Sequence, residues 1–94
     1  MTSGYEIRIA STARRQLSRL PSRSALAVVE FITTVLPENP LRLSKPLTGD
    51  FHGLRSARRG NYRVLIEVDE ATRTMLVVRI AHRSDAYRPP SPTT

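Results

Sequence analysis

The chain has 94 residues, which is enough for one small domain with a modest core. Fifteen lysines and arginines stand against eight aspartates and glutamates, giving a formal net charge of +7. The absence of cysteine excludes a disulfide framework and a thiolate metal site. No apolar run approaches the roughly 18 residues of a transmembrane helix, and the N-terminal residues lack a signal-peptide pattern. We therefore expect a cytoplasmic protein without membrane contact.

The excess of positive charge points to a polyanionic partner. Every cation except Lys45 is an arginine. The guanidinium group is a planar fork of donors that matches phosphate oxygens, so nucleic acid is the favoured partner class. An acidic protein is the main alternative. A GC-rich genome would explain arginine in place of lysine, but it would not explain the excess of charge.

The first half of the chain predicts one strand and two helices. Residues 5–9 alternate apolar and polar side chains, which is typical of a half-buried strand. Residues 11–20 follow a helical period, with Ser11 or Thr12 as the expected N-cap and Pro21 as the stop. A broad apolar stripe over residues 22–36 predicts a second helix, which completes a helical hairpin with one face for burial.

The second helix is expected to begin at a serine cap, Ser22 or Ser24, and to end at Pro37. Residues 41–52 have no regular pattern, and we expect a loop there.

The rest of the chain predicts strands at 54–59, 62–68 and 74–81, the first two joined by a Gly60-Asn61 turn. The last two are apolar on nearly both faces, so we expect them in the centre of the sheet. The predicted fold is an α+β domain in the order β-α-α-β-β-β, with a helical hairpin on a small, mainly antiparallel, four-stranded sheet. Residues 1–88 form its single domain, and the Pro-rich residues 89–94 are expected to be a disordered tail.

Four arginines without an acidic residue among them mark one candidate site: Arg55, Arg58, Arg59 and Arg63. A solvated strand edge would explain Arg58 and Arg59, which flank the turn. Arg63 lies in a strand predicted to be central, where a cation needs a carboxylate or a ligand. We therefore expect Arg63 to be functional.

A second candidate cluster spans residues 82–88, where the last strand ends. An imidazole titrates near neutrality, but a lone histidine such as His82 is more often a packing residue than a catalyst. Tyr87 is either a core aromatic or a platform on which a nucleobase stacks. The position of the cluster beside the Arg63 strand predicts a shared concave site.

Other chemistries are disfavoured. The two histidines are thirty residues apart and no carboxylates cluster, so we expect no metal and no cofactor. The chain has no glycine-rich phosphate loop, no nucleophile elbow and no close carboxylate pair.

The chain resembles the RelE/ParE toxin superfamily from about residue 5 to residue 88. The resemblance is carried by four segments: Ala13-Arg14-Arg15-Gln16-Leu17-Ser18-Arg19-Leu20-Pro21; Asn39-Pro40-Leu41-Arg42 with Lys45-Pro46-Leu47; Ser56-Ala57-Arg58-Arg59-Gly60-Asn61-Tyr62-Arg63-Val64-Leu65-Ile66; and His82-Arg83-Ser84-Asp85-Ala86-Tyr87-Arg88. The mRNA-cleaving RelE branch is the closer likeness, given the short chain and the tyrosine near its end.

That resemblance implies the toxin of a bacterial type II toxin–antitoxin pair, which enters the ribosomal A site and cleaves mRNA there. It implies a metal-independent endoribonuclease in which the neighbouring 2′-OH attacks, leaving a 2′,3′-cyclic phosphate and a 5′-OH. Arg63 and Arg83 would balance phosphate charge, His82 would be base or acid, and Tyr87 would orient a base or assist proton transfer. The residues expected to bind the RNA or its flanking phosphates are Arg55, Arg58, Arg59 and Lys45.

The implied partners are the 70S ribosome with its mRNA and a cognate RelB-like antitoxin, whose acidic segment folds over the helical hairpin and the sheet edge. Operator DNA would be reached only through the antitoxin. The chain departs from the family in one respect. Some relatives carry lysines at the positions that residues 54–57 occupy here. Arginine cannot replace a lysine that acts as a base, because it is a poor proton acceptor.

Two alternatives stay open. One is a ParE-like, non-enzymatic inhibitor of DNA gyrase with the same fold, which the histidine–arginine pair at 82–83 also fits. The other is a small basic nucleic-acid-binding module without toxicity.

Overall fold

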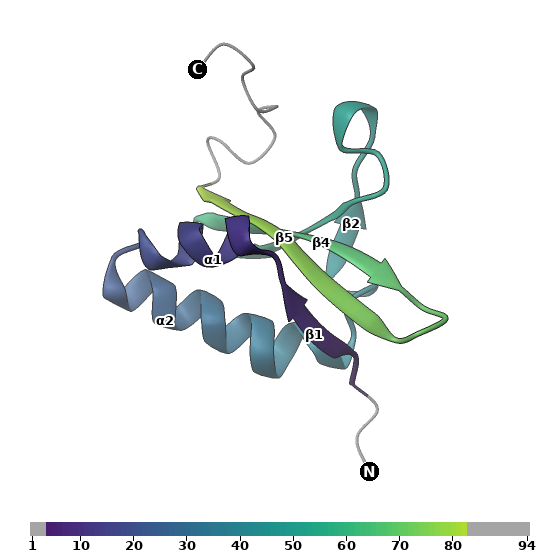
Figure 1. Ribbon diagram of the computed structural model, residues 1–94, viewed down its shortest axis with the longest axis horizontal. Coiled ribbons are helices and arrows are strands. Elements are labelled where there is room, and N and C mark those ends of the chain that lie inside the picture. The colour runs from purple at the N-terminus through teal and green to yellow at the C-terminus, as the bar shows by residue number, and fades with distance from the viewer. Residues whose placement is uncertain (1–3, 83–94) are drawn as a thin grey trace.

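The structure is a computed structural model and describes residues 4–82 (Figure 1). Two helices and five strands follow one another in the order β1 (Glu6–Ile9), α1 (Ser11–Ser18), α2 (Ser22–Glu30), β2 (Ser44–Pro46), β3 (Arg55–Arg59), β4 (Tyr62–Asp69) and β5 (Thr74–His82). Within the described part of the chain, no helix has the length and apolar character needed to cross a membrane.

The strands form one five-stranded sheet in the order β1-β5-β4-β3-β2. β1 runs parallel to β5, and the other three pairings are antiparallel. The α+β class and the central places of β4 and β5 are confirmed. The expectation of four strands is wrong, because β2 forms inside the segment predicted as a loop: its three residues pair with the edge of β3 and include Pro46, which an edge strand tolerates.

Both helices begin without the predicted side-chain caps. The residues before the first turns are Ala10 and Pro21, and neither helix has a side-chain capping hydrogen bond. The serines expected as caps instead occupy the first helical positions, Ser11 and Ser22. α2 continues through a wider turn at Phe31–Val35 and a tight turn at Leu36–Glu38, so the apolar stripe stays helical as far as predicted.

The helices lie on one side of the sheet (Figure 1) and bury its apolar residues. The core joins the two helices to alternate positions of β3, β4 and β5, and consists of Ala13, Val28, Phe31, Ile32, Leu36, Ala57, Val64, Ile66, Met75, Val77 and Ile80. We call the other side of the sheet the open face. Strand alternation assigns to it every second residue between these core positions.

A β-bulge in β5 changes which residues reach the open face. Leu65 pairs with Arg79, but the next residue, Ile66, pairs with Val77, so Val78 is the extra residue. The bulge lets Ile80 enter the core on the same side as Val77 and places Arg79 on the open face.

Helix α1 holds this bulged segment after β1 has ended. The last main-chain bond of the β1 side runs from the Ala10 N–H to the Val77 carbonyl, at 2.9 Å. Beyond it, the Gln16 Oε1 accepts a hydrogen bond from the Ile80 N–H at 2.7 Å. A glutamine side chain on α1 thus takes the place of a strand partner for β5.

Candidate functional site

A small pocket at one end of the open face gathers three cations. It has a volume of about 220 Å³ and is lined by Leu43, Lys45, Ser56, Arg58 and Arg63. We call it the cation pocket. The register explains the grouping, because Arg58 lies opposite Arg63 and Lys45 lies opposite Ser56. Among residues 4–82, no carboxylate lines the pocket.

Like charges directly opposite one another across a strand pair destabilise a sheet. The Arg58 and Arg63 pair carries that cost in the cation pocket, and Arg63 is half-buried with its Nη1 atom shielded from solvent. An anion between these side chains would offset the repulsion through charge-assisted hydrogen bonds. The pocket is therefore suited to a phosphate group.

The structure separates the four arginines that the sequence placed in one cluster. Arg59 lies on the helix side, where it lines a different hollow with Arg23 and Asn61. It is thus on the opposite side of the sheet from Arg58, its neighbour in the chain.

Arg55 is used inside the protein. Its Nε donates to the Ser44 Oγ at 2.7 Å, and its Nη2 donates to the carbonyls of Leu41 and Ser44 at 3.0 and 3.1 Å. These bonds fasten the segment before β2 to β3. The expected phosphate contact of Arg55 is replaced by a structural role.

His82 does not share a face with Arg63. It lies opposite Tyr62 in the register, and the two rings meet edge to face with centroids 5.6 Å apart. Arg63 is instead paired with Ala81 on the open face. The expected meeting of His82 and Arg63 in one concave site is therefore not formed. Arg83 and Tyr87 lie outside the described residues.

Sequence reasoning missed two members of the cation pocket, Ser56 and Leu43. Ser56 could have been found from the strand period, because it stands two residues before Arg58 and so faces the same way. Leu43 carries no such signal, since it precedes a strand that the pattern did not predict.

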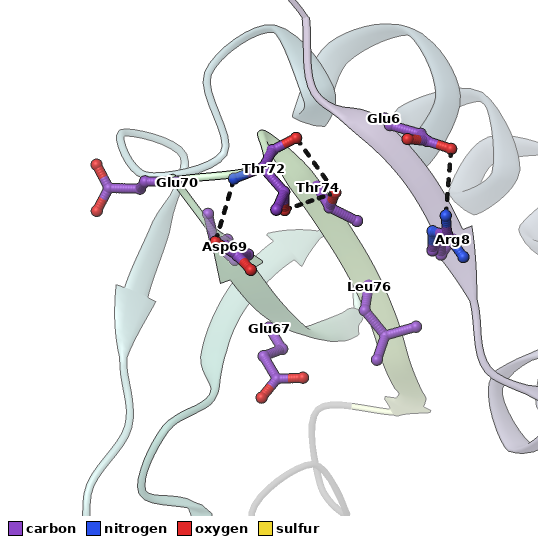
Figure 2. A pocket seen from close by; sticks show the side chains of 9 residues that line it. Glu6, Arg8, Glu67, Asp69, Glu70, Thr72, Thr74 and Leu76 are labelled. Atoms are coloured by element: carbon purple, nitrogen blue, oxygen red, sulfur yellow. Dashed lines mark hydrogen bonds and ion pairs between the residues drawn. The ribbon is translucent and has the colours of Figure 1, made fainter.

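A larger hollow at the other end of the open face has the opposite charge (Figure 2). Its volume is about 720 Å³, and Glu67, Asp69 and Glu70 of its lining come from the end of β4 and the turn that follows. We call it the acidic hollow. Glu6 and Arg8 of β1 also line it and form an exposed ion pair at 3.6 Å.

The acidic hollow does not suit a polyanion, since its carboxylates would repel phosphate. One of them has a local role: the Asp69 carboxylate accepts from the N–H groups of Ala71 and Thr72 and closes the β4–β5 turn. Among residues 4–82, no three His, Cys, Asp or Glu side chains are grouped so as to hold a metal ion.

Residues 7–87 match the family described as the ParE toxin of type II toxin–antitoxin system, parDE. The chain belongs to this family of type II toxin–antitoxin toxins.

Two relatives come from Mycobacterium tuberculosis. The chain is 48% identical over 84 residues to Toxin RelE, covering 89% of this chain and 87% of the relative. It is 46% identical over 84 residues to Toxin RelG, and the match covers 89% of this chain and 97% of the relative.

Solved structures share the fold. The M. tuberculosis RelBE2 toxin–antitoxin complex contains a chain that matches with a TM-score of 0.82 and 45% identity, covering 90% of this chain and 97% of that one. The isolated Escherichia coli RelE toxin matches with a TM-score of 0.66 over 83% of each chain at 14% identity, which shows the fold alone.

Proposed function

We propose that this toxin is a ribosome-dependent endoribonuclease that cleaves mRNA in the ribosomal A site and so stops translation. The observation that carries the proposal is the cation pocket, in which Lys45, Arg58 and Arg63 surround a space without any carboxylate. Two relatives named as RelE and RelG toxins, at 48% and 46% identity, favour the RNA-cleaving branch.

In this reaction the 2′-oxygen of the RNA forms a bond to phosphorus, and the bond from phosphorus to the 5′-oxygen breaks. The products are a 2′,3′-cyclic phosphate and a 5′-OH. Negative charge grows on the phosphorane, and Arg63 with Arg58 is placed to stabilise it. Both guanidiniums remain charged throughout, because arginine does not deprotonate in proteins.

Two protons must move as well: one leaves the 2′-OH and one reaches the 5′-oxygen. Lys45 is the cation of the pocket that can give up a proton, so we assign it the leaving 5′-oxygen. Tyr87, beyond the described residues, is still predicted to orient a base or to assist proton transfer. With so few proton-transfer groups, the site depends on the ribosome to bend and hold its substrate.

The test is toeprinting of a defined mRNA on programmed ribosomes, with wild-type protein, Arg63→Ala and a control without ribosomes. We expect wild-type cuts confined to the A-site codon, none without ribosomes, and none with a folded Arg63→Ala variant. Cuts of equal strength with Arg63→Ala would remove the centre of the proposal.

The family match itself favours a second candidate, a ParE-like inhibitor of DNA gyrase. That function needs no cleavage. It predicts intact mRNA in the toeprint and loss of supercoiling when purified gyrase is mixed with the protein.

We also propose a RelB-like antitoxin as the cognate partner, because solved relatives include RelBE and RelB–RelE complexes. Exposed apolar side chains on the second helical segment offer a docking surface: Leu26 is 71% exposed, and Val29 and Val35 are partly exposed. Large exposed apolar side chains of this kind mark interaction sites.

A further inference from the structure

A fourth hollow lies on the sheet beside α1, which contributes Thr12 and Gln16 to its lining. Its volume is about 470 Å³, and its wall is mainly apolar. Phe51 and Leu54 come from the loop between β2 and β3, Leu65 comes from the middle of β4, and Val78 is the extra residue of the β5 bulge. The charged groups Asp50 and Arg79 also line it.

The lining of this hollow adjoins the lining of the cation pocket. Leu65 lies directly opposite Ser56, which lines the cation pocket, so the two linings are in contact across the β3–β4 pair. Leu65 also stands two residues after Arg63 on the same strand face, a separation of about 7 Å. One nucleotide can therefore place its phosphate at Arg63 and its base in the neighbouring hollow.

The lining has the chemistry of a nucleobase site. An unstacked base needs a flat apolar or aromatic surface, and Phe51 offers a ring, while a guanidinium such as that of Arg79 stacks on a base. Asp50 can only accept hydrogen bonds when ionised, so it selects bases with an amino group. Adenine, cytosine and guanine have one, whereas uracil offers only its N3–H, which lies between two carbonyl oxygens that the carboxylate would repel.

We infer that this hollow, the base pocket, holds one unstacked base of the mRNA, with Phe51 stacking on it and Asp50 favouring amino-bearing bases over uracil. The inference rests on the proposed RNA cleavage and adds to it a determinant of base preference. The bulge in β5 is part of the site, since it supplies Val78 to the wall and turns Arg79 toward the open face.

Single-turnover cleavage on programmed ribosomes tests this inference, using messages that differ only in one A-site base. We expect Phe51→Ala to slow cleavage by roughly 5- to 150-fold, the range of one lost stacking contact. Asp50→Asn should lower the preference for amino-bearing bases over uracil by about tenfold. His52→Ala is the matched control, because His52 is exposed and does not line the hollow.

The outcomes separate the two proposals. If wild-type protein cleaves, Arg63→Ala does not, and both variants match His52→Ala in rate and base preference, the base pocket is wrong and the proposed function stands. If Phe51→Ala and Asp50→Asn both cleave more slowly but keep the base preference of wild-type protein, the base pocket is also wrong. If Phe51→Ala does not fold by circular dichroism, the Asp50→Asn preference decides. No cleavage by wild-type protein would overturn both proposals.

Discussion

Arg58 and Arg59 are neighbours in the chain and lie on opposite sides of the sheet, one in the cation pocket and one beside α2. They form a matched pair for separating the effect of position from the effect of charge. Each loses the same charge when changed to alanine, and both are exposed.

We expect Arg63→Ala to reduce cleavage by about 10²- to 10³-fold, the cost of removing one oxyanion-stabilising donor, and Arg58→Ala by about tenfold. Arg59→Ala should stay within twofold of wild type, because its side chain faces away from the pocket. Cleavage on programmed ribosomes measures the rate, and circular dichroism checks folding. Equal losses for Arg58→Ala and Arg59→Ala would show that only total charge matters.

Arg55 predicts a different effect, on stability. Arg55→Ala leaves the Ser44 hydroxyl and two carbonyls without their donor, so we expect the free energy of unfolding to fall by about 2 kcal/mol. Urea denaturation measures it. Arg58→Ala, which removes no side-chain hydrogen bond to another residue of 4–82, should change stability by less than about 0.5 kcal/mol. A loss no larger for Arg55 than for Arg58 would contradict this role.

The sequence placed four arginines in one candidate site, and the structure distributes them over both sides of the sheet. Composition alone shows that arginines crowd residues 55–63, and strand alternation already implies that Arg58 and Arg59 point apart. Arg55 could not be assigned, because its acceptors lie at residues 41 and 44, in a segment without a periodic pattern. His82 was misplaced because the bulge that shifts the end of β5 leaves no mark in the hydrophobic pattern.

At the scale of elements, α1 takes the place of a neighbouring strand, because its Gln16 side chain accepts a hydrogen bond from the main chain of β5. We expect Gln16→Ala to lower the free energy of unfolding by about 1–2 kcal/mol, because it leaves the half-buried Ile80 N–H without its acceptor. Gln16→Glu keeps an oxygen that can accept from the Ile80 N–H, so it should lower the free energy of unfolding by less. Urea denaturation of the two variants gives the comparison, and equal costs would show that the helix packs on β5 without need of this hydrogen bond.

The long elements were predictable because each has a clear period. β4 and β5 are long apolar runs bounded by turn residues, and the helices carry apolar stripes. β2 was not predictable, because three residues ending in proline are too few to show an alternating pattern. Its position is fixed by its pairing with β3. The serine caps failed because Ala10 and Pro21 occupy the N-cap positions, so Ser11 and Ser22 are already inside the first turns.

At the scale of the whole molecule, β4 carries opposite charges at its two ends. Arg63 is in the cation pocket near its start, while Glu67 and Asp69 line the acidic hollow about 13 and 20 Å further along the strand. RNA contacts should therefore come from one end only.

Salt dependence tests this. For single-stranded RNA, the slope of log affinity against log salt is about −0.7 for each phosphate neutralised. We expect Arg58→Gln to make the slope shallower by about 0.7 and Arg8→Gln, in the acidic hollow, to leave it unchanged. Fluorescence anisotropy with a short RNA at several salt concentrations measures both. An equal change of the slope for Arg8→Gln would mean that RNA affinity depends on the net charge of the protein and not on the position of each charge.

The acidic hollow then has a kinetic consequence. With carboxylates at one end of the open face and three cations at the other, this face carries an electric dipole. In the field of a ribosome such a dipole experiences a torque, which turns the basic end forward before contact. Glu67 and Glu70 would thus raise the fraction of collisions that arrive in the productive orientation, although neither of them touches the RNA.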